Sequence, residues 1–132
     1  MRKMLCILMA ALLATSASVA QNKDQDVFIP IGKYLQAGDY VKLSAWFADN
    51  MELDLLGSVN NCSRNQARRI MKDFFDTYTP RQFTVLHKGN NAPARYAIGT
   101  LVDAGGEKFR IIIHVKSING KSYIQQLRIE RE

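Results

Sequence analysis

The chain has 132 residues and a formal net charge of +6, and 47% of its residues are hydrophobic. This length suffices for one domain with a hydrophobic core and excludes two such domains. The moderate positive charge indicates a soluble surface, or contact with anionic groups such as lipid headgroups, glycans or acidic ligands.

The first twenty residues have the pattern of a secretory signal peptide. Arg2 and Lys3 precede an uncharged apolar run over 4–14, which is too short to span a bilayer as a helix. Ser18 and Ala20 then satisfy the small-x-small rule for cleavage. We therefore expect signal peptidase to remove this segment.

Cleavage after Ala20 would leave a mature chain, 21–132, that begins at Gln21 and forms a single domain. We expect it to be exported, to the periplasm or the extracellular space, with no transmembrane segment. Its net charge would fall to +4, because sixteen basic residues would remain against the 12 acidic ones. Nucleic acid is not an expected partner outside the cytoplasm.

Cys62 is the single cysteine of the expected mature chain, because Cys6 lies in the signal peptide. A nucleophilic thiol needs a neighbouring base, and neither histidine is near Cys62 in the sequence. We therefore expect a buried, structural thiol. The two histidines fall on separate strands without a fixed acidic spacing, so we predict no metal site and no cofactor.

Two helices are expected after a polar leader. Apolar residues of 27–37 share one helical face, and Gly38 ends that helix. Asp39 then caps a second helix over 40–47. That helix is expected to bury Leu43, Trp46 and Phe47.

Two short strands and a third helix follow. Residues 51–55 alternate apolar and acidic side chains, as a half-buried strand does, and 58–62 can return beside them after Gly57. Ser63 and Gln66 form a capping box. The helix that they begin has one apolar stripe, made of Ala67, Ile70, Met71, Phe74, Phe75 and Tyr78. Its basic residues predict a solvated face or, alternatively, an anion site.

After Pro80 the pattern changes to four long strands, with turn sequences rich in glycine and asparagine between them. This arrangement predicts an antiparallel meander. The expected strands cover 82–88, 94–103, 107–117 and 121–131.

The turn at Asn119 and Gly120 leaves two strand registers open. A two-residue turn pairs His114 with Gln125, whereas a three-residue loop ending at Gly120 pairs Ile113 with Gln125. We prefer the second register, in which His114 points away from the interior. It stacks apolar residues of the two strands, namely Phe109, Ile111, Ile113 and Val115 with Tyr123, Leu127 and Ile129.

This order of helices and strands resembles the nuclear transport factor 2-like superfamily, which is ketosteroid-isomerase-like with a cystatin-like cone. Gly38-Asp39 between the first helices and Phe47-Ala48-Asp49 at the end of the second agree with it. The resemblance covers the whole mature chain. It implies an α+β fold in which three helices pack on a strongly bent, mainly antiparallel sheet. More narrowly, the chain is similar to an uncharacterised family of small exported bacterial proteins.

The resemblance also implies positions for a catalytic trio. Asp54 falls near the base aspartate of the isomerases, Tyr34 near their oxyanion tyrosine, and His114 near the second oxyanion donor. Together they would suit proton transfer beside a carbonyl. The alternation around Asp54 places it with Glu52 instead, more than half exposed. We therefore expect that the trio does not converge, and keep an isomerase or lyase as the alternative.

The fold hosts enzymes, binding proteins and assembly modules. We expect a non-catalytic binding or interaction module of the bacterial envelope, with a small apolar ligand in its cone, or else a structural dimer with a filled cone. The expected cavity residues are Tyr34, Trp46, Tyr78, His87, Tyr96 and Gln125. A homodimer is expected to cover the opposite sheet face at Leu86, Leu101, Ile112 and Ile124.

Overall fold

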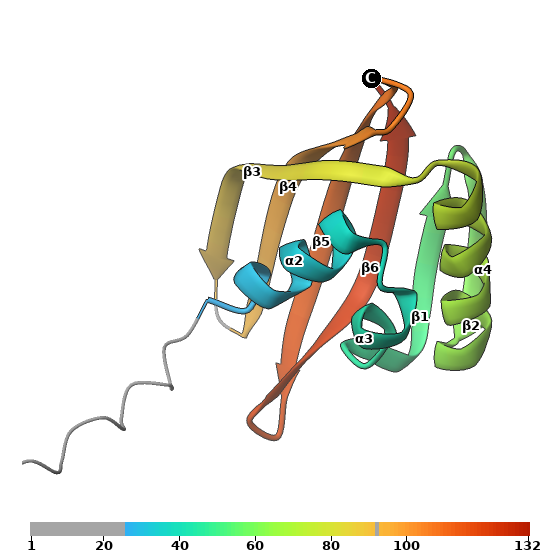
Figure 1. Cartoon of the computed structure of the whole chain (residues 1–132). Helices are drawn as coiled ribbons and strands as arrows, with labels where there is room; N and C mark the ends of the chain where they lie inside the picture. The colour runs from blue at the N-terminus through green and yellow to red at the C-terminus, as the bar shows by residue number, and fades with distance from the viewer. Residues whose placement is uncertain (1–25, 92) are drawn as a thin grey trace, which may run out of the picture.

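The computed structural model describes residues 26–91 and 93–132. The expected signal peptide and the start at Gln21 lie outside these residues. Three helices and six strands make up the described part (Figure 1). In chain order they are α2 (Phe28–Ala37), α3 (Tyr40–Ser44), β1 (Phe47–Leu55), β2 (Ser58–Ser63), α4 (Arg64–Thr77), β3 (Pro80–Asn91), β4 (Ala94–Asp103), β5 (Lys108–Ile118) and β6 (Lys121–Arg131).

The strands form one sheet in the order β2-β1-β6-β5-β4-β3. All neighbours are antiparallel except β1 and β6, which run parallel. The last four strands are the predicted meander. The helices lie on one face of the sheet, here called the inner face, and β3 bends around α2 (Figure 1). The expected α+β class is confirmed, and none of the described helices is long and apolar enough to cross a membrane.

Local capping signals set the helix ends. Gly38 ends α2 with a left-handed φ of 68°, and the Asp39 carboxylate accepts the backbone N–H of Lys42 at 3.0 Å. The capping box at Ser63 and Gln66 is present in both directions, with distances of 3.2 and 2.9 Å. The predicted caps at Gly38, Asp39 and Ser63 are therefore confirmed.

The second helix is shorter than predicted. It ends at Ser44, and Phe47 already belongs to β1 instead of the helix. The carbonyl of Trp46 accepts the backbone N–H of Ile124 at 2.6 Å, which draws the chain into the sheet beside β6. A partner 78 positions along the chain therefore overrides the local helical pattern.

The β5–β6 register differs from the preferred one. Ile118 pairs with Lys121 across a two-residue turn, and a bulge between His114 and Val115 shifts the register, so that Ile113 pairs with Leu127. The buried face of β5 is nevertheless the predicted one. It comprises Phe109, Ile111, Ile113 and Val115, and His114 is exposed on the opposite, outer face.

Two residues expected on the outer face lie in the core instead. Leu101 and Ile124 are both fully buried on the inner face. Ile124 turns inward because the bulge interrupts the alternation of β6. Leu101 follows Ala97 and Gly99, the small inner residues of β4, and the Phe83 ring covers Gly99 so closely that a Cβ there would lie 2.6 Å from it. Leu86 remains outside, with 66% of its surface exposed.

Candidate functional site

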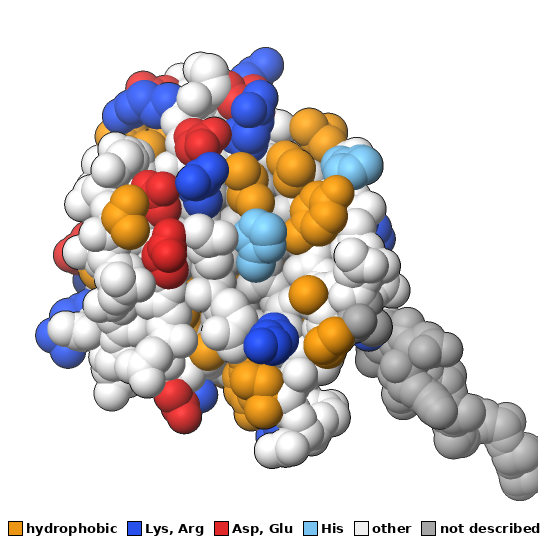
Figure 2. Space-filling model, turned by 180° about the vertical axis from the view of Figure 1, so that it is seen from behind, with side chains coloured by type: hydrophobic (Ala, Val, Ile, Leu, Met, Phe, Trp, Pro, Cys, Tyr) orange, Lys and Arg blue, Asp and Glu red, His pale blue; other side chains and the backbone are white. Residues whose placement is uncertain are grey.

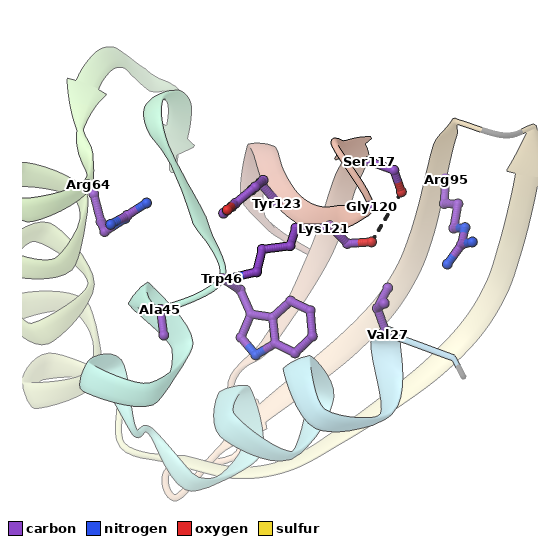
Figure 3. Close-up of a pocket in the computed structure, with 10 residues that line it drawn as sticks. Val27, Ala45, Trp46, Arg64, Arg95, Ser117, Gly120, Lys121 and Tyr123 are labelled. Carbon is purple, nitrogen blue, oxygen red and sulfur yellow. Dashed lines mark hydrogen bonds between the residues drawn. The ribbon is translucent and has the colours of Figure 1, made fainter. Parts of the chain in front are cut away.

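A cavity of about 620 Å³ opens at one end of the inner face (Figure 3). It lies between the start of α2, the end of α3, and the β5–β6 hairpin. A second cavity of about 430 Å³ shares Arg64, Lys121 and Tyr123 with it, so the two adjoin. The first is lined by Val27, Ala45, Trp46, Arg64, Arg95, Ser117, Gly120, Lys121, Ser122 and Tyr123.

Two aromatic side chains give the cavity apolar walls. Trp46 and Tyr123 are each half-buried and packed against the edge of the core. The β1–β6 pairing fixes the backbone of Trp46, and the two-residue hairpin turn sets the position of Tyr123 on β6. The Oγ atoms of Ser117 and Ser122 lie 3.3 Å apart across the hairpin. The hairpin therefore adds a polar wall to the two aromatic ones.

Three cationic side chains come from separate elements. Figure 3 shows Arg64 and Arg95 on opposite sides of the cavity, with Trp46 between them. Arg64 begins α4, and its guanidinium donates to the carbonyl of Phe47 at 3.1 Å and to the Asp49 carboxylate at 2.9 Å. Arg64 is therefore held in place by protein acceptors.

The hydrogen-bonding groups of Arg95 have fewer partners than those of Arg64. It lies on β4 opposite buried Val115, and its Nε atom is buried without a hydrogen-bond partner among the described residues. The charge of Arg95 also acts on Asp26, whose carboxylate forms an ion pair with Lys88. Burial raises the pKa of Asp26, but hydrogen bonds from Lys88 and the Phe28 backbone, with the charges of Lys88 and Arg95, hold that pKa below its ordinary value.

The structure places only part of the predicted cavity residues at this site. Trp46 lines the cavity, and Gln125 lines the adjoining one. Tyr34 packs against the core from α2. Tyr78 also packs against it, and its hydroxyl accepts a hydrogen bond from Arg131 at 2.7 Å.

The prediction that His87 and Tyr96 enter the cavity is wrong. A bulge between Val85 and His87 turns His87 to the outer face, where it pairs with Ile98. Its Nε2 atom lies 3.0 Å from the Tyr96 hydroxyl. Because this bulge breaks the alternation of β3, His87 does not share a face with Phe83 as expected.

The candidate catalytic trio is not brought together. Asp54 lies on the outer face of β1, where Arg128 donates to its carboxylate at 3.2 Å. Tyr34 belongs to α2 on the inner face, and His114 is exposed on the outer face. The expected exposure of Asp54 is wrong, because its side chain is only 14% exposed beside Arg128.

Sequence reasoning missed Arg95, Lys121 and Tyr123 as cavity residues. Arg95 and Lys121 flank turns and carry no local motif, so only the folding of the curved sheet brings them to the cavity that Trp46 lines. Arg64 belonged to the basic cluster for which an anion site was the alternative interpretation. No signal separated it from the solvated residues of the same helix.

Cys62 is buried, as predicted, with 7% of its surface exposed. Burial raises the pKa of its thiol, which disfavours the thiolate. Among residues 26–91 and 93–132, no three His, Cys, Asp or Glu side chains are grouped so as to hold a metal ion.

A family model described as a domain of unknown function (DUF4783) matches residues 28–130. The chain belongs to the DUF4783 family. No curated protein matches it significantly. The predicted similarity to a family of small bacterial proteins with this fold is thereby confirmed.

Solved structures of DUF4783 proteins have the same fold. One from Bacteroides ovatus is 26% identical, with a TM-score of 0.74, and the alignment covers 78% of this chain and 93% of that one. One from Bacteroides uniformis is 22% identical, with a TM-score of 0.77 and coverages of 81% and 98%. An NTF2-like protein of unknown function from Shewanella baltica is 9% identical, with a TM-score of 0.61 and coverages of 80% and 88%, which confirms the superfamily fold.

Proposed function

We propose that this DUF4783 protein is an exported binding module of the bacterial envelope that holds a small ligand with an apolar part beside Trp46. The cavity carries the proposal: its volume of about 620 Å³ falls in the range of ligand pockets, about 300–1,000 Å³. The centre of the inner face is filled by the protein's own buried side chains, so a ligand would bind at the cavities along its margins, and we propose the one that Trp46 lines.

Trp46 is the only tryptophan of the chain, so its fluorescence reports on this cavity directly. We expect the neutral dye N-phenyl-1-naphthylamine to quench it saturably. Ala45→Phe would place a bulky ring at an exposed position of the cavity wall, so we expect it to narrow the cavity and weaken binding of the dye. Ala37→Phe, at an exposed site on α2, is the matched control. Quenching that does not saturate, or an equal loss of dye binding in both variants, would contradict the proposal.

Export rests on the signal-peptide pattern before Gln21. We expect mass spectrometry of the protein recovered outside the cytoplasm to give a chain that begins at Gln21. A retained Met1, or a lipid attached to a cysteine, would contradict this part of the proposal.

We further propose that two copies pair through the outer face. The supporting feature is a patch formed by Leu86, Tyr96, Ile98 and Ile112, and Figure 2 shows apolar side chains gathered beside the histidines on this face. Next to it, Arg128 bonds Asp54 and Glu130, so both charge signs are available for a two-fold contact.

Sedimentation tests the pairing. We expect about twice the monomer mass for the parent, and the monomer mass for Ile112→Lys. Val41→Lys, which places the same charge at a half-exposed position of α3, should remain dimeric. A monomeric parent at high concentration would refute the pairing and leave the cavity proposal untouched.

A further inference from the structure

The cavity beside Trp46 has more positive than negative charge around it. Arg64, Arg95 and Lys121 line it, and no carboxylate does among the described residues. The two nearby acids are already engaged, because Asp49 binds Arg64 and Asp26 binds Lys88. Arg95 and Lys121 form no ion pair within the described part of the chain, and their charge favours an anion.

Arg95 supplies an observation independent of this charge balance. Its guanidinium carries five N–H donors, and the buried Nε donor has no acceptor among the described residues. Buried donors are nearly always satisfied in folded proteins, so this unpaired donor marks Arg95 as a side chain whose hydrogen bonds the described residues do not complete. A planar guanidinium matches the paired oxygens of a carboxylate or a phosphate.

The apolar walls limit the kind of anion. Trp46 and Tyr123 border the same space as the cations, and Figure 3 shows the indole between the sides that carry Arg64 and Arg95. A bare inorganic ion would leave these aromatic surfaces without contact. A ligand with an apolar body against Trp46 and a charged head toward Arg95 would satisfy both parts of the wall.

We propose that the ligand is an amphiphile with one anionic head, a carboxylate or a phosphate monoester, which the positive charges of Arg95 and Lys121 attract into the cavity while its apolar chain lies against Trp46. This inference rests on the proposed binding function. Arg64 plays a secondary part, because its donors already serve Phe47 and Asp49.

The test compares ligands that share one chain and differ in the head group. Decanoate, decyl phosphate, decan-1-ol and decyltrimethylammonium are titrated below their micelle concentrations, with Trp46 fluorescence and displacement of N-phenyl-1-naphthylamine as readouts. We expect the two anions to bind at least about tenfold more tightly than the alcohol, because charge-assisted hydrogen bonds discriminate by about that factor or more. The cation should bind most weakly. The tighter of the two anions identifies the head group.

Variants assign the effect to the proposed residues. Arg95→Met and Lys121→Met keep the length of the side chain and remove the charge, so each should reduce the preference for decanoate over decan-1-ol by about tenfold. Arg110→Met removes an arginine from the exposed outer side of β5 and should leave the preference unchanged. If Arg95→Met fails to fold, Lys121→Met, at an exposed position, still carries the test.

The outcomes separate this inference from the function on which it rests. If decan-1-ol binds as tightly as decanoate, or if both methionine variants keep the full preference, the anionic head is refuted while the apolar cavity stands. If neither the neutral dye nor any decyl ligand binds, the proposed function itself fails. Added salt should weaken binding of the two anions and leave binding of the alcohol unaffected. At a purely apolar site, salt would not distinguish the anions from the alcohol in this way.

Discussion

Replacement of Phe74 by alanine tests the packing of α4 on the sheet. Phe74 is 3% exposed, and its ring centroid lies 5.8, 5.2 and 5.3 Å from those of Phe75, Tyr78 and Phe109. Truncation of a buried phenylalanine costs about 3–5 kcal/mol of unfolding free energy. Because the substitution removes the contacts with three aromatic rings at once, we expect the free energy of unfolding to fall by about 4 kcal/mol, within that range.

Urea denaturation followed by circular dichroism measures this loss. Phe74→Leu keeps most of the buried volume and removes only the ring contacts, so we expect it to cost about 1–2 kcal/mol. Arg68→Ala, on the exposed side of the same helix, should change stability by less than about 0.5 kcal/mol. If Phe74→Ala unfolds at the midpoint of the parent, the aromatic cluster does not hold α4 on the sheet.

Three shorter predictions concern other parts of the fold. The pKa of Asp26 is lowered in the folded state, so its stabilising effect is complete above the ordinary value of 3.8 and is lost as the pH falls through the folded pKa; the parent should exceed Asp26→Asn in urea stability at pH 6, and the difference should shrink at pH 3. Cys62 should react with iodoacetamide far more slowly in the native protein than in urea, by peptide mapping, because its thiol is buried and its pKa raised; equal rates would show that it is accessible. Gly99→Ala should lower the melting temperature, because the new Cβ would lie 2.6 Å from the backbone oxygen of Thr84, whereas Gly57→Ala, with open space but a positive φ, should cost less.

The sequence by itself determined the elements that depend on near neighbours. The caps at Gly38, Asp39 and Ser63 act within four residues, so their signals are local and the helices begin or end there as predicted. The apolar stripe of α4 and the turns between the last strands are equally local. Together with the order of elements, they sufficed for the α+β fold and for the family resemblance.

Only the tertiary structure decided which strand residues face inward. The bulges at His87 and Val115 depend on the partner strand, and each one reverses the alternation beyond it, so His87 moved out of the predicted cavity and Ile124 moved into the core. The small residues of β4 face inward because the Phe83 ring needs the space above Gly99. The alternation of apolar and polar residues along a strand reveals neither where a bulge falls nor where a ring such as that of Phe83 needs space.

The cavity residues likewise divide into one that the sequence predicted and others that only the tertiary structure revealed. Trp46 was among the residues predicted to line a cavity, and it does so. Arg64, Arg95 and Lys121 come from three elements that are far apart in the chain, and no spacing in the sequence links them. That all three line one cavity follows from the order of the strands and the curvature of the sheet, which are long-range properties of the folded chain.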